Sequence, residues 1–236
     1  TLAKTFQRDA VRLTATAATE RHADIEYQVV VAQADERENA IINTLLYFDS
    51  ASSMVFCHTR EAVKHLAARL HNRELTQSER TNALQAMRDG RARVCVATDV
   101  AARGIDLPNL DLVVHADLPS NPDTMLHRSG RTGRAGRKGV CALIVPAHRR
   151  GAAARVLKLA NLEAVTRATP SRDEIEQKYR EQILDAAAAV EPASEAEAPI
   201  VAQLLERVTA EQLATAYLRQ QIAARPVPEE VAVITV

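Results

Sequence analysis

The 236-residue sequence lacks a membrane-spanning stretch and a signal-peptide pattern. No apolar run approaches the roughly 20 residues of a transmembrane helix, and the first residues, Thr1 to Lys4, are not those of a secretory signal. With 47% hydrophobic and 25% charged residues, the composition is that of a soluble globular protein with a buried core. We therefore expect a cytoplasmic protein with no membrane partner.

Cysteine is scarce, and its placement excludes two kinds of cross-link. The three cysteines, Cys57, Cys95 and Cys141, each lie inside an apolar run. Their odd number and their spacing argue against a disulfide framework and against a zinc site, because a thiol in an apolar run behaves as a small hydrophobic side chain. We expect all three thiols to be buried and reduced.

Net charge is also absent, because 30 basic and 30 acidic residues cancel. The balance is uneven along the chain: residues 171–236 hold 12 of the acids and only 6 of the bases, which leaves residues 1–170 with an excess of six cations. A basic body suits a polyanionic partner, whereas the acidic tail is unsuited to bind nucleic acid by charge.

The densest positive charge lies between His127 and Lys138, where twelve residues hold five cations, one histidine and no acid. Glycines at 130, 133, 136 and 139 let the backbone come close to a ligand. Arg131 and Arg134, three residues apart, can converge on one phosphate group. The alternative is a solvated basic turn with no ligand.

Short apolar strands alternate with helices through the middle of the chain. Strands are predicted at 25–31, 54–57, 92–97, 112–115 and 140–145, and helices at 36–48, 60–72, 77–88, 122–128 and 148–161. The alternation is typical of a parallel sheet with helices on both faces. Because ligands gather at the carboxyl ends of parallel strands, the loops after Cys57, Ala97 and His115 are the places to look for a site.

Segments at both ends fall outside this pattern. Residues 1–16 read as a short helix and strand, too small to be stable alone, and we expect them to be the remnant of a preceding domain. Residues 17–165 form the α/β body, and residues 166–236 a small all-α extension.

The extension is predicted to hold a helix capped by Ser171, a linker at 191–199 and two amphipathic helices at 200–208 and 210–224, the second of them capped by Thr209. Their apolar side chains form a surface too large for so short a segment to bury by itself. It should pack either on the body or on a second copy of the chain.

Four motifs in order make the chain resemble the C-terminal RecA-like half of a DEAD-box RNA helicase, over about residues 17–165. They are Met54 to Arg60 (motif IV), Gln77 to Arg80 (QxxR), Ala97 to Asp106 (motif V) and His127 to Arg134 (motif VI). The extension is similar to the dimerisation modules of bacterial cold-shock and heat-resistant helicases of this family. The resemblance therefore implies ATP and RNA as ligands and a homodimer through residues 171–236.

The resemblance assigns roles at the nucleotide. Arg131 and Arg134 would be arginine fingers, which stabilise charge on a transferring phosphoryl group. His127 and Arg128 would tie the site to the N-terminal RecA-like domain. Asp106 would accept hydrogen bonds from the ribose of ATP, with a structural cap as its alternative.

On the RNA side, the resemblance implies contacts with sugar and phosphate from Thr59, Arg80, Thr98 and Gly104. An ordinary helix N-cap is the alternative for Thr59. The low aromatic content, 3% with no tryptophan, agrees with binding through the backbone of RNA rather than by stacking of bases.

Two absences separate this chain from a complete helicase. It has neither a GxxxxGK[ST] phosphate loop nor a DEAD tetrad, so we expect Mg²⁺ to be held by the missing N-terminal domain and the chain alone to hydrolyse no ATP. Roughly ten residues, enough for one strand, also look absent between Arg73 and Glu74, and we expect a break in the chain there.

Two other functions fit the sequence less well. One is a stand-alone RecA-like module that binds nucleic acid or protein without an ATP cycle. The other is a DNA-directed helicase of the same superfamily, against which the compact HRSGRTGR run argues.

Overall fold

A single parallel sheet of six strands organises the computed structural model, which describes residues 24–71, 85–103, 110–133, 136–232 and 234. The strand order is β3-β2-β4-β5-β1-β6, and every pairing is parallel. The strands are β1 (Ile25–Ala32), β2 (Ser53–Phe56), β3 (Val94–Ala97), β4 (Leu112–His115), β5 (Gly139–Pro146) and β6 (Val165–Ala168). The predicted parallel sheet is confirmed.

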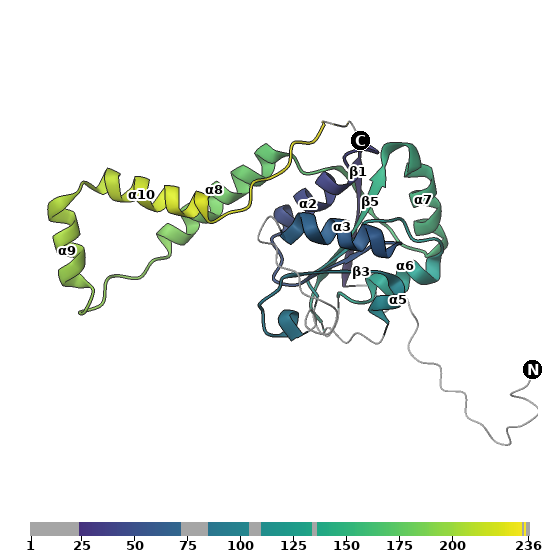
Figure 1. Ribbon diagram of the computed structural model, residues 1–236, viewed down its shortest axis with the longest axis horizontal. Coiled ribbons are helices and arrows are strands. Elements are labelled where there is room, and N and C mark those ends of the chain that lie inside the picture. The colour runs from purple at the N-terminus through teal and green to yellow at the C-terminus, as the bar shows by residue number, and fades with distance from the viewer. Residues whose placement is uncertain (1–23, 72–84, 104–109, 134–135, 233, 235–236) are drawn as a thin grey trace, which may run out of the picture.

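Helices cover both faces of the sheet, also as predicted (Figure 1). On one face lie α5 (Asp99–Ala102), α6 (Pro122–Ser129) and α7 (Arg150–Leu159), which bury Ala102, Met125 and Leu157 respectively. On the other lie α2 (Arg37–Phe48), α3 (Arg60–His71) and α8 (Arg172–Ala188), which bury Ile41, Leu66 and Ile175 respectively. Each face of the sheet therefore has its own hydrophobic core.

The sheet extends past residue 165, where the sequence analysis ended the body. Strand β6 pairs with β1 at the sheet edge, with Gln28 opposite Val165. It was missed because its four residues are only partly buried and do not form an apolar run. A short 3₁₀ turn, η2 (Ala147–Arg149), also precedes α7, where a continuous helix from His148 was predicted.

The extension consists of α8, α9 (Ala198–Arg207) and α10 (Ala210–Ala223), and it projects from one side of the body (Figure 1). Ser171 caps α8 in a reciprocal pair with Glu174, and Thr209 does the same for α10. Pro199, predicted to lie in the linker, instead lies in the first turn of α9, where its missing N–H costs nothing. Of the helices described, none has the length and apolar character that crossing a bilayer requires.

After α10 the chain returns to the body, which the sequence did not predict. Asn43, fully buried in α2, donates to the carbonyls of Pro170 and Glu229 at 2.9 Å each and accepts from the Glu229 N–H at 2.8 Å. Arg69 of α3 adds an ion pair to the Glu229 carboxylate at 2.5 Å. This tail, the segment that follows α10, therefore fastens the base of the extension to α2 and α3.

Three predictions fall outside the described residues. They are the helix and strand at residues 1–16, most of the helix at 77–88, and the break between Arg73 and Glu74.

The predicted burial of the cysteines is confirmed. Cys57, Cys95 and Cys141 are buried and free, and burial raises the pKa of the Cys57 thiol to about 12.

Candidate functional site

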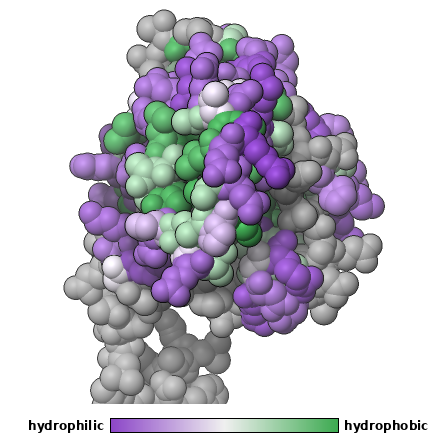
Figure 2. All heavy atoms as spheres, turned by 90° about the vertical axis from the view of Figure 1, so that its left-hand side faces the viewer, coloured by the Kyte–Doolittle hydropathy of each residue, from purple (hydrophilic) through white to green (hydrophobic). Residues whose placement is uncertain are grey.

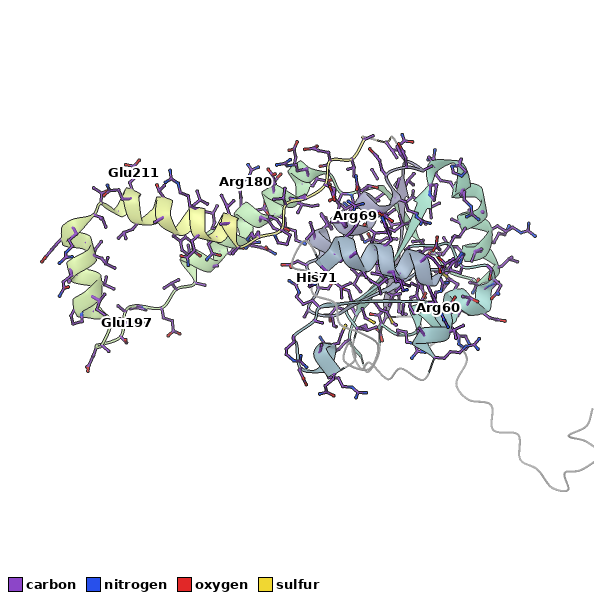
Figure 3. All side chains as sticks on the ribbon, viewed as in Figure 1. Arg60, Arg69, His71, Arg180, Glu197 and Glu211 are labelled. Carbon is purple, nitrogen blue, oxygen red and sulfur yellow. The ribbon has the colours of Figure 1, made fainter. Side chains whose placement is uncertain are left out.

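The loops singled out from the sequence meet at one edge of the sheet. Parallel pairing places Phe56, the last residue of β2, between Ala97 of β3 and His115 of β4. The segments that follow these three strands are therefore neighbours at the carboxyl edge. In Figure 3, Arg60 at the start of α3 lies on the side of the body where α5 and α6 are, and His71 lies on the side of the extension.

Two threonines predicted to contact RNA begin helices at this edge. The Thr59 hydroxyl accepts a hydrogen bond from the Ala62 N–H at 3.1 Å, and the Thr98 hydroxyl accepts one from the Ala101 N–H at 3.3 Å. The helix cap considered as an alternative for Thr59 is thus present. A capping hydroxyl still has a proton to donate, so the cap leaves each threonine able to bind a phosphate oxygen.

Arg128 lies inside the body. Its side chain is 2% exposed and forms a bidentate pair with Asp99, with both N–O distances 2.7 Å. Its third nitrogen donates to the Asp117 carbonyl at 2.9 Å, and its guanidinium lies 5.2 Å from the Phe56 ring. This geometry differs from the predicted contact with a partner domain, because the donors are turned inward to acceptors of the same body.

The Arg128–Asp99 pair joins two of the motifs. Hydrogen bonding from Arg128 is the main cause that holds the pKa of Asp99 below its usual range, so the carboxylate stays charged at neutral pH. Asp99 is the first residue of α5 and follows Thr98, while Arg128 belongs to α6 and the basic run. The threonine cap and the arginine-bearing loop are therefore held in one geometry.

Asp117, which the sequence analysis did not select, is a junction at the same edge. Its carboxylate accepts a hydrogen bond from the backbone N–H of His58 at 2.8 Å and forms an ion pair with Arg37 at the start of α2. The backbone carbonyl of Asp117 accepts a hydrogen bond from the Arg128 guanidinium. Asp117 thus links the loop before Thr59 to the basic run. The only sequence signal for it was a carboxylate two residues beyond a buried strand.

The described part of the basic run keeps two predicted residues near the surface. His127, in the last turn of α6, is exposed, and Arg131 is partly exposed just after the helix, with its N–H donating to the Arg128 carbonyl at 3.2 Å. Both side chains lie where a partner or ligand can reach them.

Two of the glycines in the run serve the fold. A Cβ on Gly139 would lie 1.9 Å from the Thr132 hydroxyl and 2.6 Å from the Gly133 nitrogen. Gly133 has a φ of +62°, and a Cβ there would meet the Ile25 side chain at 2.4 Å. The close backbone approach predicted for a ligand is, at these two positions, an approach to the chain itself.

The remaining predicted site residues, Arg80, Gly104, Asp106 and Arg134, lie outside the described residues. Within the described part, no group of three or more His, Cys, Asp or Glu side chains could hold a metal ion. His115 ends β4 and is fully buried, and neither ring nitrogen has a hydrogen-bond partner there. Burial lowers the pKa of His115 to about 3, so the imidazole is neutral.

Comparison with known proteins agrees with the geometry. A family model described as the helicase conserved C-terminal domain matches residues 23–136. The chain is 38% identical over 156 residues to the ATP-dependent RNA helicase SrmB of Escherichia coli, which covers 62% of this chain and 35% of SrmB. It is 47% identical over 107 residues to the ATP-dependent RNA helicase DBP8 of Meyerozyma guilliermondii, which covers 42% of this chain and 25% of DBP8. The chain thus spans about a quarter to a third of the length of these curated relatives.

Solved structures give the same result. E. coli SrmB bound to regulator of ribonuclease activity A (RraA) matches with a TM-score of 0.52 and 36% identity, over 64% of this chain and 93% of that one. Dbp5 of Saccharomyces cerevisiae bound to RNA and ADP BeF3 matches with a TM-score of 0.61 and 27% identity, over 76% of this chain and 51% of that one. The predicted RecA-like fold is confirmed, and the chain belongs to the DEAD-box RNA helicase family, of which it carries the C-terminal helicase domain.

Proposed function

We propose that the full-length protein is an ATP-dependent RNA helicase that unwinds or remodels RNA, and that this chain supplies its C-terminal half. One observation carries the proposal: the pair between buried Arg128 and partly exposed Asp99, with Asp117 beside it, holds the starts of α3 and α5 and the basic run together at one sheet edge. A helicase needs this coupling, because ATP hydrolysis must change the contacts made to RNA.

At the nucleotide, we assign the roles that the motifs imply. Arg131 and Arg134 stabilise negative charge on the γ-phosphoryl group, and Asp106 accepts hydrogen bonds from the ribose. His127 contacts the N-terminal RecA-like domain, which supplies the phosphate loop and the residues that hold Mg²⁺. Arg128 acts differently from the role predicted from its motif: it orients α6 from inside the body.

At RNA, we assign roles to the two capping threonines and to two further residues of the motifs. The hydroxyl groups of Thr59 and Thr98 donate hydrogen bonds to phosphate oxygens. Arg80 adds a guanidinium donor, and Gly104 adds a backbone N–H. Contacts of this kind read no base sequence, which suits an enzyme that acts along varied RNA.

We also propose that the extension makes a homodimer, as in bacterial helicases of the cold-shock and heat-resistant type. Helices α9 and α10 bury none of their residues, although several of these are apolar. Ile200, Leu205 and Ile222 are each more than half exposed. Figure 2 shows apolar residues gathered at the end of the molecule that carries the extension. An apolar surface on so small a unit favours a self-complementary interface.

The catalytic proposal is tested by strand separation with the full-length protein. We expect a short RNA duplex to be unwound with ATP, RNA to stimulate ATP hydrolysis, and single-stranded RNA to compete better than DNA of the same sequence. The chain of 236 residues should hydrolyse no ATP under the same conditions. A full-length protein that binds RNA equally with and without ATP, and hydrolyses none, is a binding module and contradicts the proposal.

The molar mass of the chain in solution, measured by light scattering, tests the proposed dimer. Leu205→Glu with Ile222→Glu should reduce the light-scattering mass of the chain from two copies to one, while Arg180→Glu on α8, equally exposed but polar, should not. A single-copy mass for the unchanged chain at micromolar concentration would refute the dimer.

A further inference from the structure

Helix α7 carries a basic face that the site described above does not use. Between Asp123 and Glu163 the sequence contains no acidic residue. Within that stretch η2 and α7 present four cations, Arg149, Arg150, Arg155 and Lys158, and all four are exposed. None of these side chains forms an ion pair or hydrogen bond with any residue in the described ranges. The positive charge of this face is therefore uncompensated.

The helix geometry places two of these cations, Arg155 and Lys158, on the outside of the body, while Arg149 and Arg150 are exposed where the helix begins. Ala153 and Leu157 turn inward and are 1% and 7% exposed. Arg155 and Lys158, three residues apart, lie on the same side of the helix and away from those two. From Arg150 to Lys158 the helix rises about 12 Å, which is long enough to face more than one phosphate of an extended strand.

The position of α7 separates it from the acidic part of the chain. It packs beside α6, on the sheet face that also carries α5, and lies at the edge of the body opposite the extension (Figure 1). Glu197 and Glu211 mark the far, acidic end of the molecule in Figure 3. A polyanion bound on α7 is thus adjacent to the elements of the site and remote from the acidic residues at the far end of the extension.

We propose that the basic face of α7, formed by Arg149, Arg150, Arg155 and Lys158, binds the phosphate backbone of RNA that extends beyond the strand held at Thr59 and Thr98. The inference rests on the proposed function, since it takes RNA as the substrate. It deepens that function by adding a second, sequence-independent contact that favours long RNA over short RNA.

The chemistry of the face favours RNA over an acidic protein segment. Protein interfaces depend on a buried apolar centre. Leu159, 62% exposed, is the one large exposed apolar residue that α7 offers in the described structure. Protein–nucleic acid interfaces are more polar and much more positively charged, and arginine matches phosphate geometry with two parallel hydrogen bonds.

The test compares two charge-matched variants of the full-length protein. One carries Arg150→Gln, Arg155→Gln and Lys158→Gln; the control carries Arg180→Gln, Arg207→Gln and Arg219→Gln in the extension, where all three side chains are also exposed. Affinity is measured for single-stranded RNA of about 8 and about 40 nucleotides between about 50 and 200 mM salt.

At about 0.7 log unit per phosphate contact, the α7 variant should lower the salt slope for the long RNA by about 2 and weaken its binding ten- to hundredfold near 0.1 M salt. Binding of the short RNA, and the ATP hydrolysis it stimulates, should be unchanged. An unaltered slope for the long RNA, or an equal loss in the control, overturns the α7 site. Failure of the unchanged protein to hydrolyse ATP with the short RNA overturns the proposed function instead.

Discussion

The pair of Arg128 and Asp99 is unequally buried, and this predicts an unequal response to mutation. The Arg128 side chain is 2% exposed, whereas that of Asp99 is 40% exposed. Asp99→Asn keeps the shape of the site but leaves a guanidinium buried without its counter-charge. Breaking a buried pair in this way costs about 3–5 kcal/mol, and the partial exposure of Asp99 puts our expectation at the lower end, about 3 kcal/mol.

Arg128→Met should reduce the stability of the chain less than Asp99→Asn does, although it is the larger chemical change. It removes the buried charge itself and keeps most of the apolar contact with Phe56. The Asp99 carboxylate that remains can be hydrated, and the unpaired Asp117 carbonyl adds about 1 kcal/mol, for a total of about 1–2 kcal/mol. The double variant should be no less stable than Arg128→Met alone, because the orphaned charge is absent from both.

Urea unfolding of the chain measures these differences directly, with a common slope for all variants. We expect Asp99→Asn to lower the free energy of unfolding more than Arg128→Met does. The reverse order, or costs that simply add in the double variant, would show that Arg128 stabilises the body by packing and that its buried charge is not what Asp99 compensates.

Three further predictions concern stability and RNA binding. The folded chain keeps His115 neutral down to a pKa of about 3, while the unfolded chain protonates near 6.5, so stability should fall as pH drops below 6.5, by about 2 kcal/mol at pH 5. His115→Leu should remove that loss, as urea unfolding at pH 7 and pH 5 would reveal; an identical loss in the variant speaks against this cause. Asp117→Asn should raise the RNA concentration needed for half-maximal ATP hydrolysis by the full-length protein severalfold with little change in kcat, because its carboxylate fixes the loop before Thr59; a lower kcat alone would argue otherwise. Gly139→Ala should cost about 1–3 kcal/mol, since its Cβ would strike the Thr132 hydroxyl and the Gly133 backbone, and an unchanged melting temperature would disprove the close approach.

The parts of the fold that were predictable from the sequence are those with local causes. Strand β4 was predicted at its observed bounds because three apolar residues in a row, Leu112 to Val114, lie between Asp111 and His115. The caps of α8 and α10 were predicted because Ser171 and Thr209 bond within their own first turns. In each case, the sequence pattern that indicates the element lies within a few residues of it.

The parts that were missed depend on distant contacts. Strand β6 has no pattern of its own and exists because β1 offers an unpaired edge. The tail is held by Asn43, whose bond to Glu229 spans 186 residues. Motif matching could place Arg128 near the site, yet only the fold shows that Asp99 turns it inward.

In the proposed function, the loop following α6 completes a nucleotide pocket, and substitution of Arg131 in that loop is the sharpest test. In the full-length protein, Arg131→Ala should reduce kcat for RNA-stimulated ATP hydrolysis by about 10³-fold or more while RNA binding changes little. Arg137→Ala is the matched control, because Arg137 belongs to the same basic run but is exposed and pairs with Asp111 at 3.3 Å, and its kcat should stay within about twofold of the unchanged protein. Equal kcat values for the two variants would contradict the account.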